Sequence, residues 1–464
     1  MTDFILKYRW FIIGFCIILG ISFIVLIPFS ETDPEIRNYV PSKMNSRIET
    51  DKIETEFGVQ DIVMLIFTDS SILTNRNLQQ IKDIDRDISK LTNVASRISP
   101  FTTRTIRNSE GMMIVDPLIR RIPSEKDTAG FNQLKSDILD NRFARDIVIS
   151  SDMTSASITA TISDAEPETV TIQKIDSIIN AHTGDTRVLK GGLPYIRQHI
   201  MRDVQRDAII LVPLALIVML LILKFALGEW KSVFIPFSVV VLSTGLSMGM
   251  IPLLGWKMSI ITLLVPVLLI SIANNYGIYL VAGYQDIRLR GEGASGSDIV
   301  RELTGSLNVP ILFSGLTTIA GILGLLVHSI KPARQMGVLA ATGVTTALIM
   351  SLIFIPALIS LRRKSVPRIG SGSTRHGNFN RFFDSLSGMI IKYPGRIILV
   401  TGFITLIFVS GIFLLKIETN QENYFPKKNP VRQASEVINM KFGGSQTISV
   451  MISGDIKDPS VMKG

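Results

Sequence analysis

Cysteine is almost absent from this chain of 464 residues, which has only Cys16. A single cysteine excludes a disulfide framework and a cysteine-rich metal site. Charged residues are also scarce, at 19%, whereas hydrophobic residues make up 47% and the mean hydropathy is positive, at +0.37. This balance is not typical of a soluble chain of several domains, and it predicts a membrane protein.

Sequence motifs for catalysis and for nucleotide binding are missing as well. No G-x-x-x-x-G-K-[ST] loop occurs, so the chain carries no phosphate-binding loop of that kind. His182 and His199 are isolated, and no cluster of His, Cys, Asp and Glu has metal-ligand spacing. We therefore expect no enzyme activity, no cofactor and no metal. The net charge of +9 does not predict nucleic-acid binding, because the basic residues gather beside the apolar runs.

Long apolar runs dominate what the sequence does contain. A run of about 18 residues or more can cross the hydrocarbon layer as a helix. Pro28-Phe29-Ser30-Glu31, at the end of the first run, offers no small-x-small cleavage site, so we expect 1–29 to be an anchored helix and not a signal peptide. Five further helices are predicted within 206–361. The seven runs are 11–29, 208–227, 232–254, 258–282, 308–328, 336–361 and 396–415.

Basic residues in the predicted linker 362–395 indicate the orientation in the membrane. Lys and Arg are enriched in cytoplasmic loops, so this segment is predicted to be cytoplasmic. Counting the crossings back places the N-terminus in the cytoplasm and the hydrophilic region 30–205 outside, in a multi-pass protein of the inner (cell) membrane. The basic residues are Arg362, Arg363, Lys364, Arg368, Arg375, Arg381 and Lys392, against Asp384 alone.

The region 30–205 alternates between strand and helix patterns. The run 62–67 is compact and apolar, which indicates a strand, and 73–92 places apolar residues at helical spacing. Further strands are predicted at 147–149, 155–162 and 187–189, with a helix over 167–181. This order favours a small α+β domain with helices on one face of a sheet.

An internal repeat relates the first and last apolar runs. Four pairs of short motifs differ in number by the same 385 residues, across a helix and the segment after it. The unit is one helix, a large external domain and five helices. We expect 396–415 and 416–464 to begin a second, truncated copy; the alternative is a complete seven-helix protein with a short external tail. The pairs are Lys7-Tyr8 with Lys392-Tyr393, Tyr39-Val40-Pro41 with Tyr424-Phe425-Pro426, Arg47 with Arg432, and Phe57-Gly58 with Phe442-Gly443.

This organisation of one plus five helices resembles the RND superfamily, and within it the MMPL-type and hydrophobe/amphiphile-efflux exporters. The resemblance implies a polytopic α-helical membrane protein with a porter-like α+β domain outside the membrane. It covers essentially the whole chain and rests on the order of several weak motifs. They are Gly191–Ile196 running through Arg202-Asp203, Ser271–Leu280, Ser314–Gly321, and Arg334–Gly337 leading to Ile355–Leu358.

One position departs from the family pattern. Where the family motif has an Asp that can carry a proton, this chain has Asn275, and an amide does not titrate. We expect one of three roles for Asn274-Asn275-Tyr276: hydrogen bonding between helices, a neutral partner of a titrating second half, or a cation site with Ser271 and backbone carbonyls. Thr317, Thr318, Thr345 and Thr346 either line a hydrophilic path or bond to carbonyls of their own helices.

The resemblance implies a secondary exporter of hydrophobic or amphiphilic molecules, driven by a proton or other ion gradient. Its partners would be membrane lipid, an amphiphilic substrate and the second half of the same polypeptide, and the helix pattern is compatible with a homo-oligomer. The alternative is a lipid-binding or regulatory RND-like protein, similar to sterol-sensing relatives, without proton coupling in this half. A carboxylate in the second copy of the fourth helix, near 275 + 385 = 660, would favour transport.

Overall fold

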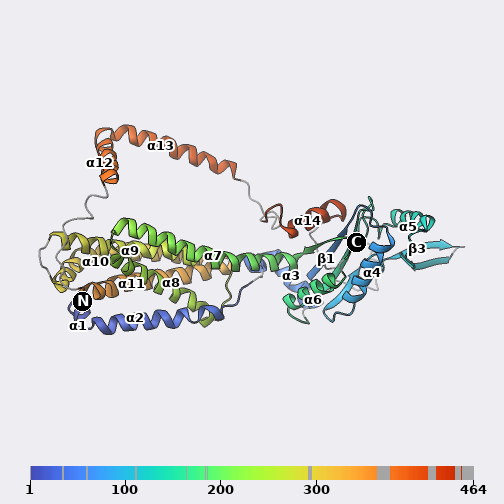
Figure 1. Cartoon of the computed structure of the whole chain (residues 1–464), viewed down its shortest axis with the longest axis horizontal. Coiled ribbons are helices and arrows are strands. Elements are labelled where there is room, and N and C mark those ends of the chain that lie inside the picture. Colours follow the sequence, from blue (N-terminus) through green and yellow to red (C-terminus); the bar gives the residue numbers. More distant parts are fainter. Residues whose placement is uncertain are drawn as a thin grey trace. The chain divides into compact units, whose positions relative to one another are not determined.

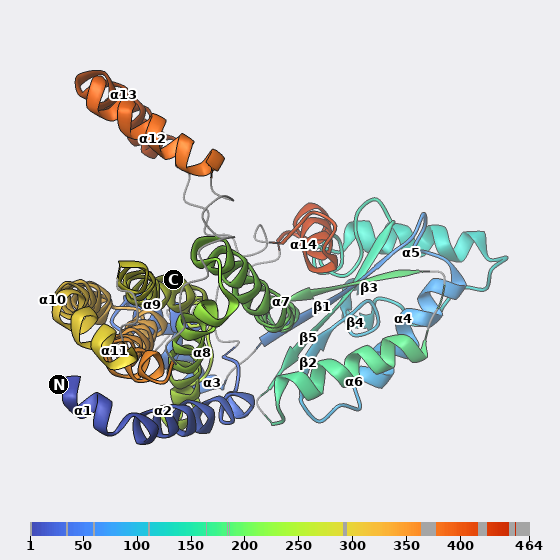
Figure 2. The same cartoon turned by 60° about the vertical axis from the view of Figure 1, so that its left-hand side comes forward.

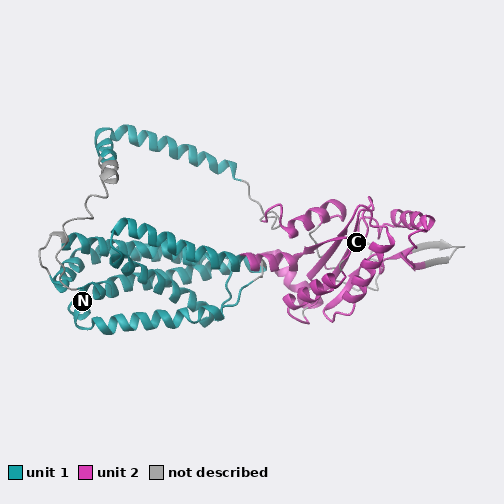
Figure 3. Ribbon diagram, in the orientation of Figure 1, with its two compact units in different colours: residues 1–33, 37–39, 204–418 teal, residues 34–36, 40–203, 419–464 magenta. Residues whose placement is uncertain are grey.

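A computed structural model gives the fold of residues 2–444 and 451, except 34–35, 59–60, 110–111, 164, 183, 185, 291–294, 363–376 and 416–424. The chain divides into two compact units (Figure 3). The membrane unit comprises 1–33, 37–39 and 204–418, and the sheet unit comprises 34–36, 40–203 and 419–464. Parts of the predicted linker 362–395 and of the predicted domain 416–464 lie outside the described residues.

The described residues include seven helices that are long and apolar enough to cross a membrane (Figure 1). The first joins α2 (Arg9–Ile24) to the short η1 (Ile27–Phe29), after α1 (Thr2–Lys7). Helices of this length and hydropathy confirm the prediction of a multi-pass membrane protein. The others are α7 (Leu193–Leu227), α8 (Trp230–Leu253), α9 (Leu264–Arg290), α10 (Gly296–Leu323, followed by η3, Gly324–Val327), α11 (Lys331–Ser360) and α13 (Pro394–Ser410, followed by η4, Gly411–Leu414).

Three helices begin well away from the start that hydropathy predicts. Helix α7 begins at Leu193, ahead of the run 208–227 and inside the region predicted to be external. The other two are α9 and α10, whose starts are fixed by local hydrogen bonds. The run 258–282 is not helical from its start, because Thr262 Oγ1 accepts the Ser259 backbone N–H at 2.8 Å in a turn before α9. The run 308–328 belongs to a helix that begins earlier, at Gly296, where Ser295 and Asp298 form a capping box. In both cases local hydrogen bonds, which hydropathy does not report, fix the first helical residue.

Small residues let the helices of the membrane unit approach closely. A Cβ at Gly249 on α8 would lie 2.2 Å from the Phe23 carbonyl oxygen of α2, and one at Gly277 on α9 would lie 2.4 Å from Pro236 Cβ of α8. Helix association in lipid depends on such packing, since lipid tails are as apolar as leucine. Helices α8 and α11 contribute most of the fully buried side chains of this unit.

An antiparallel four-stranded sheet of order β2-β5-β1-β6 forms the centre of the sheet unit (Figure 2). Helices α4 (Asn75–Ile88) and α6 (Glu168–Ala181) lie side by side and pack into one apolar core with the sheet. The strand and helix predicted at 62–67 and 73–92 are confirmed, as are those at 155–162 and 167–181. The strands are β1 (Asp61–Thr68), β2 (Val94–Ile98), β5 (Ser155–Ile162) and β6 (Arg187–Gly192).

The strand predicted at 187–189 is confirmed as part of β6, but two other predictions for this region need correction. Residues 147–149 are not a strand: Ile149 makes only isolated bridges, to Arg145 and Ala156. The sheet also has a helix on its second face, α14 (Pro430–Lys441), although helices were predicted on one face only. The elements of this region that the sequence patterns missed are η2 (Ile36–Tyr39), α3 (Asn45–Phe57), β2, the hairpin of β3 (Arg104–Ser109) and β4 (Met112–Pro117), and α5 (Thr128–Asp140).

Two helix starts recur at the spacing of the repeat. Helix α2 begins at Arg9 and α13 at Pro394, and α3 begins at Asn45 and α14 at Pro430, so each pair differs by 385. Helix α12 (Gly377–Lys392) precedes α13. The repeat stays a prediction for the rest of the second copy, because 445–450 and 452–464 lie outside the described residues.

Candidate functional site

The polar residues of α9 divide between two faces of the helix. Tyr276 is buried, at 3% exposure, and Asn274 is half-buried. Ser271 and Asn275 are exposed, and Tyr279, one turn further, is 62% exposed. A spacing of four residues places Ser271, Asn275 and Tyr279 in one row along the helix. The predicted cluster is therefore not a single site.

We call Ser271, Asn275 and Tyr279 the α9 polar stripe. It lies within the apolar span Leu264–Arg288, between exposed apolar residues on the N-terminal side and Asp286 on the C-terminal side. Amide and hydroxyl groups at this depth are costly to expose to hydrocarbon. The stripe therefore has the chemistry of a surface that faces protein or a polar path.

The inward-facing polar atoms of α9 lack hydrogen bonds among the described residues. The Tyr276 hydroxyl and Asn274 Oδ1 are buried without a partner of standard geometry, and Thr318 of α10 is the hydroxyl that interacts with Tyr276. Thr244 Oγ1 on α8 and Ser351 Oγ on α11 are also buried without a hydrogen-bond partner among the described residues. Each buried polar group without a hydrogen bond costs about 1–3 kcal/mol of stability. The polar side chains inside this group of helices therefore destabilise its packing.

Three of the four predicted threonines bond to their own helices. Thr317 and Thr318 donate to the Ser314 carbonyl at 2.9 and 2.8 Å, and Thr345 donates to the Ala341 carbonyl at 2.7 Å. Thr346 is half-buried. Of the two interpretations of these residues, the bonds to helix carbonyls support local satisfaction and not a continuous hydrophilic path.

Thr244 and Ser351 were not among the predicted site residues. The signal that could have found them is their small polar side chain inside a long apolar run, the same feature that marked Ser271. Among the residues that the structure describes, no group of three or more His, Cys, Asp and Glu side chains could hold a metal ion.

A second polar cluster anchors the start of α7 to the sheet unit. The Arg197 guanidinium, 3% exposed, donates to Asp61 at 2.5 Å and to Glu168 at 2.8 Å, from β1 and α6. The Tyr195 hydroxyl donates to Asp176 at 2.9 Å, and Lys190 pairs with the same carboxylate at 2.7 Å. Burial and the neighbouring Asp176 charge raise the pKa of Tyr195, so its hydroxyl stays protonated as a donor.

Seven apolar spans, close helix packing at small residues and a polar row on one helix define a polytopic membrane protein. The sequence profile of the MMPL family matches residues 38–396, which is most of the chain. The chain therefore belongs to the MMPL family, as the resemblance in its motifs predicted.

Individual relatives are distant. The chain is similar to "Membrane protein YdfJ" of Bacillus subtilis (strain 168), with 22% identity over 237 residues, which cover 49% of this chain and 31% of that protein. It is also similar to "Probable transport protein MmpL1" of Mycobacterium tuberculosis, at 23% identity over 163 residues, or 35% and 16% of the two chains. The protein MJ1562 of Methanocaldococcus jannaschii is 20% identical over 332 residues, or 68% and 81%. The match thus spans less than a third of the first two relatives.

Proposed function

We propose that this chain is the first half, and the start of the second, of a secondary exporter for hydrophobic or amphiphilic molecules. The observation that carries the proposal is the α9 polar stripe, whose Ser271 and Asn275 are exposed on the membrane unit at membrane depth. The stripe is not part of the packed core of the helices, because Ser271 and Asn275 are exposed. An amide side chain that faced lipid would cost free energy. The stripe is therefore assigned to an interface with the second half that contains a polar path.

The orientation supports this assignment. Basic residues follow α11 and reach the start of α13, among them Arg362, Lys392 and Arg396, and their excess favours the cytoplasmic side. The sheet unit then lies outside the cytoplasm as a porter-like domain, where it meets the substrate. The inner membrane is the location that this proposal requires.

Coupling to an ion gradient needs a group that titrates or binds a cation. The Asn275 amide cannot carry a proton, so the proposal puts the carboxylate in the matching helix of the second half, near position 660 (275 + 385). Asn275 is then its neutral hydrogen-bonding partner across the interface. Asp286, exposed near the C-terminal end of the same helix, marks the end of the path.

One observation favours a second function. The threonines of α10 and α11 bond to their own helices, and the site position is the neutral Asn275. A lipid-binding or regulatory protein without proton coupling in this half would need neither a titrating group at position 275 nor a hydrophilic path along these threonines. Both functions use membrane lipid or an amphiphile as partner, and neither includes an enzymatic step.

The test is amphiphile movement by the full-length gene product in liposomes, with and without a pH gradient. Asn275→Leu keeps side-chain size but removes the amide; Thr317→Val is the matched control, since that hydroxyl bonds to its own helix. We expect gradient-driven efflux in the parent and in Thr317→Val, and its loss in Asn275→Leu. Equal efflux by Asn275→Leu would overturn the role of the stripe, and lipid binding without efflux in the parent would establish the regulatory alternative.

A further inference from the structure

The segment that follows α2 pairs with the loop between α8 and α9. Thr32 forms a parallel bridge with Met258. The Asp33 backbone N–H donates to the Met258 carbonyl at 2.8 Å, and the Met258 N–H donates to the Glu31 carbonyl at 2.7 Å. These are hydrogen bonds of ordinary length, and they tie together two segments that are far apart in the sequence.

Tyr39 makes a second contact with the same loop. Its side chain is half-buried, and its hydroxyl oxygen accepts the Ile260 backbone N–H at 3.0 Å. We call these two contacts, Glu31–Asp33 with Met258 and Tyr39 with Ile260, the clasp. All of its residues belong to the membrane unit, so the clasp is a feature of that unit alone.

The clasp lies where the chain passes from one unit to the other. Tyr39 is the last residue of the membrane unit before the long stretch Val40–Asp203 of the sheet unit, and the chain returns to the membrane unit at Val204. Directly after that return, the Gln205 amide of α7 donates to the Thr32 hydroxyl at 3.3 Å. The residues at both ends of this stretch are therefore tied to the same short pairing.

A rigid turn joins the clasp to α9. Ser259 and Thr262 are both 1% exposed. The Thr262 hydroxyl accepts the Ser259 backbone N–H at 2.8 Å, and the Ser259 hydroxyl accepts the Thr262 N–H at 3.2 Å. Pro266 lies in the first turn of α9, where proline is tolerated, and no proline follows it before Asn275. About 16 Å of continuous helix then separates the start of α9 from Asn275.

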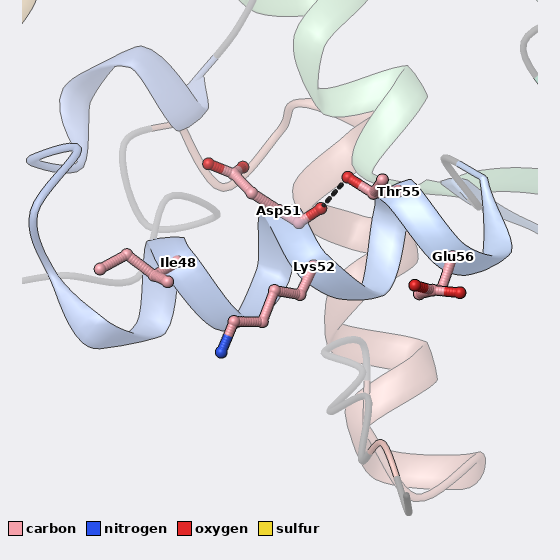
Figure 4. Close-up of a pocket in the computed structure, with 5 residues that line it drawn as sticks. All are labelled: Ile48, Asp51, Lys52, Thr55 and Glu56. Carbon is pink, nitrogen blue, oxygen red and sulfur yellow. Dashed lines mark hydrogen bonds between the residues drawn. The ribbon is translucent and has the colours of Figure 1, made fainter.

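Helix α3, which follows the clasp in sequence, has no buried residue. Its open polar side is drawn in Figure 4, where Ile48, Asp51, Lys52, Thr55 and Glu56 line a shallow hollow of about 370 Å³. The hydrogen bond in this hollow runs from the Thr55 hydroxyl to the Asp51 carbonyl of the same helix, at 2.7 Å. The hollow therefore supplies control positions that are close to the clasp in sequence but do not belong to it.

The contacts of the clasp are of a kind that stays closed. Its backbone hydrogen bonds do not titrate, and burial raises the pKa of Tyr39, so that hydroxyl stays neutral. An ion pair at the rim joins Lys257 to Glu31 at 3.2 Å, but both side chains are more than half exposed, and such pairs contribute little. The clasp therefore depends on neutral hydrogen bonds, which salt does not screen as it screens charges.

We propose that the clasp is a closed joint that positions α9, and with it the α9 polar stripe, and that Tyr39 is its positioning residue. The role of the stripe rests on the proposed function. A displacement of the sheet unit acts on Tyr39 directly along the chain, because the next residue belongs to that unit. The clasp passes the displacement to Ile260, and the turn passes it to the first residues of α9. Tyr39 thus acts on the stripe through the loop.

The experiment is maleimide labelling of Asn275→Cys in the full-length gene product in liposomes, with Cys16 and any later cysteine replaced by Ala. Tyr39→Phe removes the oxygen that accepts the Ile260 N–H. Thr55→Val is the matched control, because it loses a hydroxyl that bonds within α3. We expect Tyr39→Phe to speed labelling at position 275 at least about fivefold, the lower end of typical coupling between sites, and Thr55→Val to leave the rate unchanged.

A disulfide across the clasp tests whether it works as a closed joint. Thr32→Cys with Met258→Cys, oxidised with copper–phenanthroline, joins two bridged residues, which lie within the span of a disulfide. We expect this lock to leave labelling at position 275 unchanged in the Tyr39 parent. In the Tyr39→Phe background it should restore the parent rate, which a general loss of folding would not allow.

Equal labelling of the Tyr39→Phe variant and the parent would overturn the proposal. A rate that stays raised after locking would show that Tyr39 acts elsewhere, and slowed labelling in the locked parent would show that the clasp must open; either result overturns it too. Labelling needs neither substrate nor gradient. Absent efflux with the expected labelling therefore refutes the proposed function alone, and gradient-driven efflux with unchanged labelling refutes the joint alone.

Discussion

Replacing Arg197 by Ala removes the group on which two carboxylates converge at the start of α7. The guanidinium is 3% exposed, and Asp61 and Glu168 are 17% and 29% exposed. Removing one member of a buried ion pair costs about 3–5 kcal/mol, because the remaining charge stays desolvated. Since both carboxylates keep some contact with water, we expect the lower end of this range, about 3 kcal/mol.

Thermal unfolding of the detergent-purified protein measures this loss. For a domain of 150–250 residues, 1 kcal/mol corresponds to about 2–4 °C, so Arg197→Ala should lower the Tm of the sheet unit by about 6–12 °C. Arg142→Ala, at an exposed position, is the matched control and should change the Tm by no more than about 2 °C.

A double-mutant cycle identifies the cause. If the stranded carboxylate is responsible, Asp61→Asn should recover part of the loss in the Arg197→Ala background and should be destabilising in the parent. A Tm for Arg197→Ala equal to that of Arg142→Ala would refute the assignment of Arg197 as an anchor. Additive effects in the cycle would refute its pairing with Asp61.

Three further measurements follow from other contacts. Tyr195→Phe removes the donor to Asp176 and should cost about 1.5–3 kcal/mol in thermal unfolding, the usual worth of a hydrogen bond to a charged group. Gly249→Val, where a Cβ would meet the Phe23 carbonyl, should reduce the yield of monodisperse protein, whereas Gly402→Val has open space and should not. Burial alone would raise the pKa of Asp152, but hydrogen bonds from Ser150, Lys441 and Thr154 outweigh it and hold that pKa well below its usual value. Because the folded pKa is depressed, this contribution is present above the unfolded pKa of about 4 and is lost as the pH falls below it; Asp152→Asn should flatten the Tm profile in that acid range.

The elements that could be predicted from sequence are those with a strong local period. Helix α4 has apolar residues at helical spacing, and β1 is a short apolar run because both of its faces are covered. The run 147–149 looks equally apolar, but Ile149 finds only isolated bridge partners. Whether a short apolar run becomes a strand depends on neighbours that are distant in sequence.

The polar residues of α9 can be picked out from the sequence, but their arrangement around the helix bundle cannot. Spacing alone puts Ser271 and Asn275 in one row and Tyr276 in another. It does not tell which row faces the other helices, because α9 is apolar nearly all round and lacks the amphipathic signal that orients a helix in water. Packing at Gly277 and Gly343 decides the matter, since both admit side chains of neighbouring helices.

The unbroken length of α7 has a mechanical consequence. Its 35 residues extend about 52 Å, against a hydrocarbon layer of about 30 Å, so a substantial part of one rod stands clear of the lipid. The rod has no loop that could absorb rotation, and Pro213 is its only internal proline. Pro213 cannot donate a backbone hydrogen bond to the preceding turn, so we expect any bend in α7 to be centred there.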